Sequence, residues 1–490
     1  MKTPQTLLIK NAEYIVTLDK KRLILRNASV FIEGKQILEV GTERTNADVI
    51  INASGMVVFP GFINTHLHIP QVFHRHCPAQ QNKPIAEWIQ VTTSINRELD
   101  GEAVYYGALV CFIELLLSGV TTTLDYFYPF IRGKKGLMEA VIKAAHDIGI
   151  RFTCIRGSMS LSKKQGTLYN DDVVEDLDTI LSHSQNMIDA HHDNGKYSLC
   201  RIGLGPCLPF AGTEEDYRET VKLARKYPGV ILQTHAAESL WEVEYCNKKF
   251  GTTPIGLMKK TGFFGTDVSL VHCNILKEAE VKFLGRSRTN VVITPICNTR
   301  DASDGNGIAP MTKLLKAGAN ISIGVDGPAS NDSMNIQDEM RYLRVVSKGK
   351  EGLFWYKGQD QARFSYMHPL DVLEITNIGG ATTLNRNDVG SIEVGKAADL
   401  VIFDPDQEIS HAGAVNKWAS ILSCQPLKPK YLLINGKVII KDGILQTVNT
   451  SDINQRFRKI HKGVVNRAQK RLKRNLIEYP KTRKGRNGAS

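Results

Sequence analysis

Two histidines separated by one residue, His66 and His68, follow a short apolar run. In an extended segment, residues two apart point to the same side, so both imidazoles can reach one ion. Such a pair alone is weak evidence, because structural histidines can fall at this spacing by chance. A second pair, His74 and His76, flanks Arg75 with no strand-like run before it. We interpret this second pair as unrelated to metal binding.

Four more polar residues lie at or just beyond the ends of apolar, β-rich runs. They are His235, Glu238 three residues later, His272 and Asp326. Barrel enzymes build their sites at the carboxyl ends of the strands, so these groups are expected to meet on one face together with the first histidine pair. A single histidine is usually structural, but this many at the same end of apolar strands indicates a site.

The residue types indicate metal-dependent hydrolysis. Imidazole and carboxylate suit Zn²⁺ or Fe²⁺, and a catalytic site keeps a position for water. Three neutral histidines and one aspartate leave a divalent ion with net positive charge, which lowers the pKa of bound water from ~15.7 toward ~7. The resulting hydroxide can attack an electron-poor carbon. Glu238, close to His235, is then the candidate proton shuttle.

The middle of the chain has the pattern of a barrel. Eight apolar strand candidates fall at 61–64, 121–125, 151–155, 199–204, 230–234, 268–272, 291–294 and 321–325. Helical patterns lie between several of them, at 102–117, 137–147, 214–226 and 309–317. Strands alternating with helices in this number predict an α/β protein with a (β/α)₈ TIM barrel over residues 60–389.

Both ends of the chain are rich in short β runs. Residues 1–59 predict a small antiparallel sheet with tight turns, and the β signal returns at 390–447 with a hairpin turn at Asn435-Gly436. Each part is too small to bury a face alone. We therefore expect one composite β-sandwich made from both termini, with the barrel inserted between them.

The net charge of +12 is concentrated in the last part of the chain, 448–490. Residues 451–490 alone hold thirteen Lys or Arg and two acids, so they carry +11 and leave +1 for the rest. We expect a basic helical or disordered tail, solvated or docked on an acidic patch of the barrel. This localisation disfavours a nucleic-acid partner, since the body of the protein is nearly neutral.

Cysteine usage and hydropathy indicate the compartment. The nine cysteines are irregularly spaced and form no Cys-x-x-Cys, which is typical of free thiols in a reducing environment. No signal peptide pattern and no membrane-spanning run is present. We therefore expect a cytoplasmic protein without a membrane partner, and we further expect a homo-oligomer.

Several motifs together resemble the amidohydrolase superfamily over almost the whole chain. Residues 58–68, Val-Phe-Pro-Gly-Phe-Ile-Asn-Thr-His-Leu-His, are similar to its first-strand signature, and 235–238, His-Ala-Ala-Glu, to its His-x-x-Glu. Residues 325–332, Val-Asp-Gly-Pro-Ala-Ser-Asn-Asp, and 156–161, Arg-Gly-Ser-Met-Ser-Leu, resemble the branch with triazine hydrolases, hydroxyatrazine ethylaminohydrolase and 8-oxoguanine deaminase. Residues 395–400, Gly-Lys-Ala-Ala-Asp-Leu, match a trait of the family's β-sandwich.

The resemblance implies roles for individual residues. It implies one divalent ion, zinc or alternatively iron, with the ligands His66, His68, His235 and Asp326. It implies three catalytic residues: Glu238 as acid/base, His272 to position or polarise water and substrate, and Asp326. It implies substrate contacts from Gln71, Trp88 and Arg156. One departure concerns the loop after strand seven, where relatives often carry His-Cys-Pro-x-Ser-Asn and this chain has Thr-Pro-Ile-Cys-Asn at 294–298.

The sequence therefore predicts a metal-dependent hydrolytic deaminase that acts on the C–N bonds of a small nitrogen heterocycle, such as an oxopurine, pterin or pyrimidine. A triazine-type chlorohydrolase or N-alkylaminohydrolase is the alternative, because it uses the same attack on a different leaving group. A non-catalytic scaffold or RNA-binding protein is the alternative of another class. A binuclear site is disfavoured because the predicted fourth strand has no lysine to carbamylate, and Lys196 precedes it. The cytidine deaminase motifs are absent.

Overall fold

The structure, a computed structural model, describes residues 5–81, 83–300, 307–356 and 367–479. Its centre is a sheet of eight parallel strands in chain order, which confirms the predicted barrel. The strands are β6 (Phe62–Asn64), β7 (Val120–Phe127), β8 (Arg151–Ser158), β9 (Cys200–Pro206), β10 (Ile231–Ala236), β11 (Val268–His272), β12 (Asn290–Ile293) and β13 (Ile321–Ile323). The first and last strands meet where Thr65 N donates to Ile323 O and Leu67 bridges Asp326, so the barrel closes.

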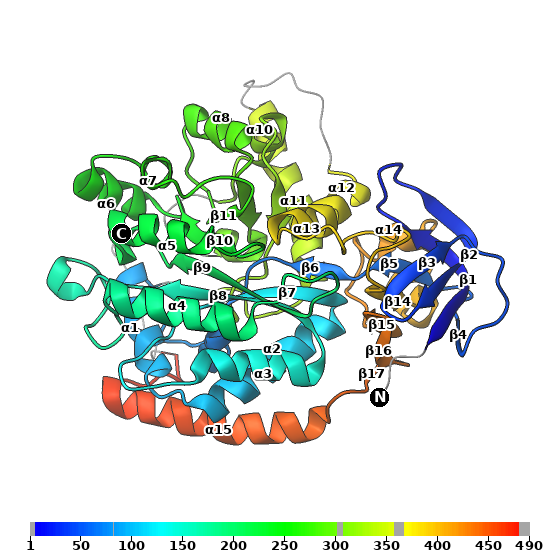
Figure 1. The fold of residues 1–490 in the computed structure, drawn as a ribbon, viewed down its shortest axis with the longest axis horizontal. Coiled ribbons are helices and arrows are strands. Elements are labelled where there is room, and N and C mark those ends of the chain that lie inside the picture. The colour runs from blue at the N-terminus through cyan, green and yellow to red at the C-terminus, as the bar shows by residue number, and fades with distance from the viewer. Residues whose placement is uncertain (1–4, 82, 301–306, 357–366, 480–490) are drawn as a thin grey trace, which may run out of the picture.

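Helices cover the outside of this sheet, in the order strand, helix, strand (Figure 1). The predicted helices are present, with ends that differ by one or two residues in most cases. Side-chain caps set the starts of some of them; for example, Asp100 accepts from Ala103 N, and Thr213 forms a capping box with Asp216. The helices are α1 (Ile85–Asn96), α2 (Gly101–Leu117), α3 (Leu137–Ile148), α4 (Leu177–His191), α5 (Glu214–Ala224), α6 (Leu240–Phe250), α7 (Pro254–Thr261), α8 (Glu278–Ser287), α9 (Pro295–Arg300), α10 (Met311–Lys316), α11 (Ile336–Tyr356), α12 (Pro369–Glu374), α13 (Gly380–Thr383) and α14 (Lys417–Ser420).

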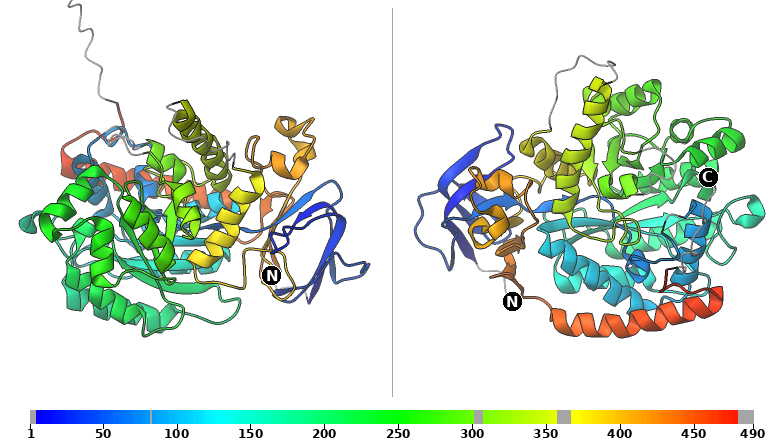
Figure 2. Two further views of the ribbon diagram at one scale, coloured as in Figure 1. Left: turned by 90° about the horizontal axis from the view of Figure 1, so that it is seen from above. Right: turned by 180° about the vertical axis from the view of Figure 1, so that it is seen from behind.

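A second sheet of nine strands lies beside the barrel and joins both ends of the chain (Figures 1 and 2). Its order is β17-β16-β15-β14-β5-β1-β2-β3, with β4 beside β1. The strands are β1 (Thr6–Val16), β2 (Ile24–Glu33), β3 (Gln36–Val40), β4 (Val49–Asn52), β5 (Val57–Pro60), β14 (Leu400–Phe403), β15 (Tyr431–Ile434), β16 (Lys437–Lys441) and β17 (Ile444–Leu445). The expected small β unit from both termini is confirmed.

The expectation of an antiparallel N-terminal sheet is wrong for two of its pairs. β1 runs parallel to β4 and to β5, and antiparallel only to β2. β5 continues almost directly into the barrel strand β6, so its direction is set by the entry into the barrel, and this direction is the same as that of β1. β14 pairs antiparallel with β5 and ties the two termini together. The sheet curls, so that Ile37 N donates to Lys396 O and a separate apolar core is enclosed.

The basic tail forms one long helix, α15 (Thr450–Leu472), which docks along α1 and α2 (Figure 1). Its apolar face includes Val464 and Ala468, both fully buried. Arg456 pairs with Glu102, and both Arg467 and Arg471 pair with Glu98, so the tail meets an acidic patch of its own barrel. This is the docked arrangement that the sequence allowed; residues 480–490 of the tail lie outside the described part.

Two further expectations concern the whole chain. All nine cysteines are free thiols, as predicted. Among the described residues, every helix is too short or too polar to cross a membrane.

Candidate metal centre and catalytic pocket

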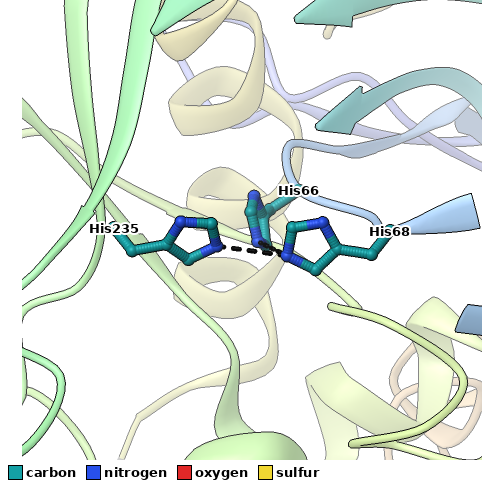
Figure 3. Close-up of side chains that lie close together, drawn as sticks. All are labelled: His66, His68 and His235. Atoms are coloured by element: carbon teal, nitrogen blue, oxygen red, sulfur yellow. Dashed lines mark hydrogen bonds between the residues drawn. The ribbon is translucent and has the colours of Figure 1, made fainter. Parts of the chain in front are cut away.

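Three histidines converge at the carboxyl end of the barrel strands (Figure 3). His66 and His68 follow β6, and His235 lies near the end of β10. The Nε2 atom of His68 lies 3.2 Å from Nε2 of His66 and 3.1 Å from Nε2 of His235. All three side chains are buried. Three ring nitrogens from two distant parts of the chain are thus brought to one point.

The opposite nitrogen of each ring has a fixed acceptor. Nδ1 of His66 lies 2.8 Å from Gln233 Oε1, Nδ1 of His68 lies 3.0 Å from the Tyr126 carbonyl, and Nδ1 of His235 lies 2.6 Å from the Cys207 carbonyl. A carbonyl oxygen can only accept, so each Nδ1 carries the proton and each Nε2 presents a lone pair. Three lone pairs directed at one point repel each other unless a cation lies between them. The residues therefore fit a divalent metal ion.

Burial keeps these imidazoles in the form that binds metal. It lowers the pKa of His66 to about 3, and it lowers the pKa of His68 and, strongly, that of His235. A protonated histidine cannot ligate, so burial favours the neutral ligand at neutral pH. The His66–His68–His235 cluster is a metal site in geometry and in protonation state.

Asp326 lies beside this cluster, just after β13. Its Oδ1 is 3.5 Å from His68 Nε2 and 3.7 Å from His66 Nε2, and it accepts the Gly327 backbone N–H at 2.8 Å. Burial alone would raise the pKa of this carboxyl, but the positive charge that His68 and His66 carry when protonated outweighs burial and lowers the pKa to about 2. Asp326 is thus an ionised oxygen donor at the distance where a shared cation could reach it.

Glu238 and His272 lie together on the neighbouring side of the cluster. His272 Nε2 is 3.5 Å from Glu238 Oε1, and its Nδ1 is 2.8 Å from Asn298 Oδ1. Burial opposes protonation of His272, but the carboxylates of Glu238 and Asp326 raise its pKa above the ordinary value. The Glu238 side chain is 34% exposed, in contrast to the buried histidines, because it faces a cavity.

The backbone at these positions is unusual. Ala237, His272 and Asp326 have φ of 54°, 74° and 57°, in the left-handed region that side chains other than glycine rarely adopt. Each lies at or next to a strand end, where the chain must turn sharply to present its side chain to the centre. Such conformations cost about 1–3 kcal/mol each and persist only where surrounding contacts impose them. Residues with positive φ also occur elsewhere in the chain, and these three are the ones that lie at strand ends beside the candidate chemistry.

A cavity of about 300 Å³ opens over the cluster. Its lining includes His68, His235, Glu238, His272 and Asp326 at one end. Aromatic side chains form much of the remaining wall: Trp88, Tyr128, Tyr169, Phe210 and Trp241. A cavity with aromatic walls and a few polar groups is typical of a small-molecule site.

The three predicted substrate contacts lie in different places. Gln71 and Trp88 line the cavity, and Gln71 Oε1 is buried with no hydrogen-bond partner among the described atoms. Arg156 is not among the lining residues. Its guanidinium is buried, donates to Glu175 at 2.6 Å and covers the Phe130 ring at 3.9 Å. These contacts within the protein are sufficient to explain why an arginine is buried at position 156.

The side chains of the second histidine pair, His74 and His76, make contacts of their own outside the three-histidine cluster. His74 is buried and its Nδ1 lies 2.9 Å from Gln80 Oε1, whereas His76 is exposed near Asp332. Within the described ranges, His66, His68 and His235 form the one cluster close enough to hold a metal. Strand β9 contains no lysine, which agrees with a site without a carbamylated ligand.

Four residues that support the site were missed from the sequence: Gln233, Asn298, Glu242 and Glu339. Gln233 could have been found, because it precedes His235 by two residues on one strand and shares its face. Glu242 falls three residues after the helix cap Ser239, a recognisable capping spacing. Glu339 is buried and accepts from Ile296 N and from Asn331 Nδ2, which joins the loops after β12 and β13. No local pattern identifies such a long-range brace.

The chain is similar in sequence to known proteins over most of its length. The chain is 32% identical over 410 residues to 8-oxoguanine deaminase of Pseudomonas aeruginosa, which covers 83% of this chain and 87% of the relative. It is 28% identical over 451 residues to 5-methylthioadenosine/S-adenosylhomocysteine deaminase of Caldanaerobacter subterraneus, covering 91% and 96% of the two chains.

Among solved structures, the chain resembles atrazine chlorohydrolase from Arthrobacter aurescens complexed with zinc. The TM-score is 0.86 at 25% identity, over 93% of this chain and all of the other.

The family model for the amidohydrolase family matches residues 57–439, from the last N-terminal strand through the barrel and into the C-terminal strands. That span contains every residue of the candidate site. It confirms the expected class, a hydrolase acting on carbon–nitrogen bonds other than peptide bonds. The chain belongs to the amidohydrolase family.

Proposed function

We propose that this protein is a hydrolytic deaminase with one zinc ion, acting on a small nitrogen heterocycle such as an oxopurine, pterin or pyrimidine. The observation that carries the proposal is the set of three buried Nε2 lone pairs, each oriented by an outward hydrogen bond, at the base of an aromatic cavity. The similarity to two deaminases of purine compounds supports the choice of leaving group.

The proposed ligands are His66, His68, His235 and Asp326, and the donor set suits zinc or, as the alternative, iron. When bound, the cation would supply a Lewis acid that lowers the pKa of a water molecule toward ~7. The residues of the chain then supply proton transfer and positioning. The aromatic walls hold a planar ring, with Trp88 and Gln71 as proposed contacts.

Glu238 is the proposed acid/base. Its carboxylate faces the cavity, and it can hold the proton removed from the attacking water. It can deliver this proton to a ring nitrogen. It can then move the remaining proton, from the hydroxyl group formed on the tetrahedral carbon, to the amine, which leaves as ammonia while the carbonyl forms. His272 lies 3.5 Å from Glu238 and is fixed by Asn298, so it can hold the attacking oxygen and the developing tetrahedral carbon in place.

A chlorohydrolase or N-alkylaminohydrolase activity is the second candidate. It is favoured by the similarity in fold to the atrazine chlorohydrolase, which extends over the whole of that chain. The same residues would direct attack at a ring carbon, and only the leaving group would differ.

The test is a screen of purines, pterins, pyrimidines and triazines with zinc-loaded protein. Release of ammonia, of an alkylamine and of chloride is measured separately for each compound. We expect ammonia from at least one purine, pterin or pyrimidine. Chloride or alkylamine as the main product would favour the second candidate, and no product from any heterocycle would contradict both.

A further inference from the structure

Glu242, on the first turn of α6, has contacts that a surface helix does not require. It is 1% exposed, although it carries a carboxyl group and α6 lies on the outside of the barrel. Its Oε1 accepts the backbone N–H of Ala237 at 2.9 Å, and its Oε2 accepts the backbone N–H of Glu238 at 2.8 Å. One side chain thus occupies both donors of the turn that carries the proposed acid/base.

This turn is one of the strained positions of the site. Ala237 has φ of 54°, and this conformation makes consecutive N–H groups point to one side, where a carboxylate can bind both. Carboxylate bonds to backbone N–H are charge-assisted and stronger than neutral ones. Removal of the carboxylate would leave two buried donors unsatisfied and a strained residue without its support.

The other contacts of the turn do not replace this one. Ile275 N donates to Ala237 O, and Asn274 Nδ2 donates to Glu238 O at 3.3 Å, so both act on carbonyl groups. Ser239 caps α6 by accepting from Glu242 N, which fixes the start of the helix. Within the described residues, the Glu242 carboxylate is the acceptor for the two amide protons.

We propose that Glu242 is a positioning residue that acts through Glu238. By fixing the backbone at Ala237 and Glu238, it holds the Glu238 carboxylate toward His272 and the cavity. This inference rests on the proposed acid/base role of Glu238. Burial raises the pKa of Glu242 to about 7, whereas the bonds from the Glu238 and Ala237 N–H groups lower this pKa and so favour the ionised acceptor.

The test compares Glu242→Gln with Glu244→Gln, an exposed glutamate two residues along the same helix that is absent from the cavity lining. Glutamine keeps one acceptor oxygen but turns its NH₂ group toward the second amide. We expect kcat to fall by about 10–100-fold in Glu242→Gln, with KM within about threefold and zinc retained, and no change in Glu244→Gln.

Two further measurements separate positioning from a general structural role. In the double variant Glu238→Gln/Glu242→Gln, kcat should be less than about threefold lower than in Glu238→Gln alone, because both residues act on one step. In zinc-loaded protein without substrate, hydrogen exchange at Ala237 and Glu238 should accelerate in Glu242→Gln and not in Glu244→Gln.

Each result decides the proposal. A kcat of Glu242→Gln within threefold of the parent, unchanged exchange, additive losses or loss of zinc would each overturn it. If no heterocycle is turned over by the parent, the proposed function fails on its own. The exchange rates then still decide whether Glu242 fixes the turn.

Discussion

Two buried polar clusters lie at opposite ends of the same barrel, and their side chains are satisfied in different ways. At the amino ends of the strands, Arg151 forms two 2.9 Å bonds to Asp399, and Arg386 pairs in the same bidentate way with Asp388. Asn435 joins the first pair by accepting from Arg151 and donating its own N–H to Asp399. In this cluster, the charged groups are partnered with each other.

At the carboxyl ends, the polar groups are instead held from behind. Each of the three histidines donates a hydrogen bond from Nδ1 to an acceptor in the surrounding structure and directs its Nε2 to a common point. They are His66, His68 and His235. The first arrangement locks the barrel to the second sheet, since Asp399 and Asn435 belong to that sheet's segments. The arrangement at the carboxyl ends leaves three Nε2 lone pairs that can bind a metal ion. The difference indicates that burial alone does not distinguish a structural cluster from a reactive one. The two clusters are distinguished by whether polar atoms, such as the histidine Nε2 atoms, point to a common site instead of to partners in the protein.

The largest effects should follow from removing a proposed ligand. His235→Ala or Asp326→Ala should remove both the metal and the activity, with a loss of more than about 10⁴-fold in turnover, because the water molecule would no longer be acidified. Elemental analysis should give one divalent ion per chain in the parent and none in the variants. Chelation should abolish activity and zinc should restore it. Two ions per chain, or active protein without metal, would contradict the mononuclear site.

Changes at Glu238 and His272 should spare the metal while slowing the reaction. Glu238→Gln keeps the size of the side chain but removes the transferable proton, and a positioned acid/base contributes about 10²–10⁴-fold. His272→Asn should also slow turnover, because it weakens the hold on the attacking oxygen. Metal content and kcat are measured together. Loss of metal in either variant would identify that residue as a ligand, and a fully active Glu238→Gln would move proton transfer to another group.

The cluster at the amino ends should respond in stability and not in catalysis. Arg151→Met leaves Asp399 buried without its cation, and breaking a buried pair in this way costs about 3–5 kcal/mol. Denaturant unfolding should show this loss, while the folded variant keeps its zinc and a kcat within about threefold of the parent. Arg151→Met/Asp399→Leu should recover part of the stability, since no charge is left unpaired. A large fall in kcat with unchanged stability would reverse the assignment of the two clusters.

The sequence predicted the position of the reactive residues better than it predicted the pairing of the N-terminal strands. Apolar strand periodicity and the positions of strand ends were sufficient to place His235, His272 and Asp326 on one face, because parallel strands in a barrel all end at the same rim. The parallel pairing of β1 with β5 was not predictable from local runs, since it depends on where the chain must enter the barrel.

The supporting contacts of the site were harder to predict than its reactive groups. Gln233 and Glu242 have local signals in the sequence. In contrast, the bond that Ile296 N donates to Glu339 joins residues 43 apart. Arg156 is a residue type that often contacts substrates, but here it pairs with Glu175. Such partners depend on the packing of helices against the barrel. Sequence patterns identify which groups can react, and the structure is needed to find what orients them.

The smallest effect is expected at the tail, which approaches the outer part of the cavity wall. Arg474 pairs with Glu87, next to Trp88, and Leu476 is buried with its carbonyl accepting from Cys77 Sγ. None of these residues reaches the three-histidine cluster. The tail therefore contacts the segment that presents Trp88 to the cavity, and not the elements that hold the metal.

Truncation before Lys470 should accordingly raise KM by up to about tenfold and leave kcat within about tenfold, where each factor of ten is ~1.4 kcal/mol. The lost ion pairs are partly exposed and contribute little, so burial of Leu476 should account for most of the effect. Truncation after Tyr479 is the matched control, because it removes four basic residues but none of these contacts. A larger fall in kcat than in 1/KM would show that the tail helps to build the reactive end of the site. An equal change in both truncations would trace the effect to charge and not to packing.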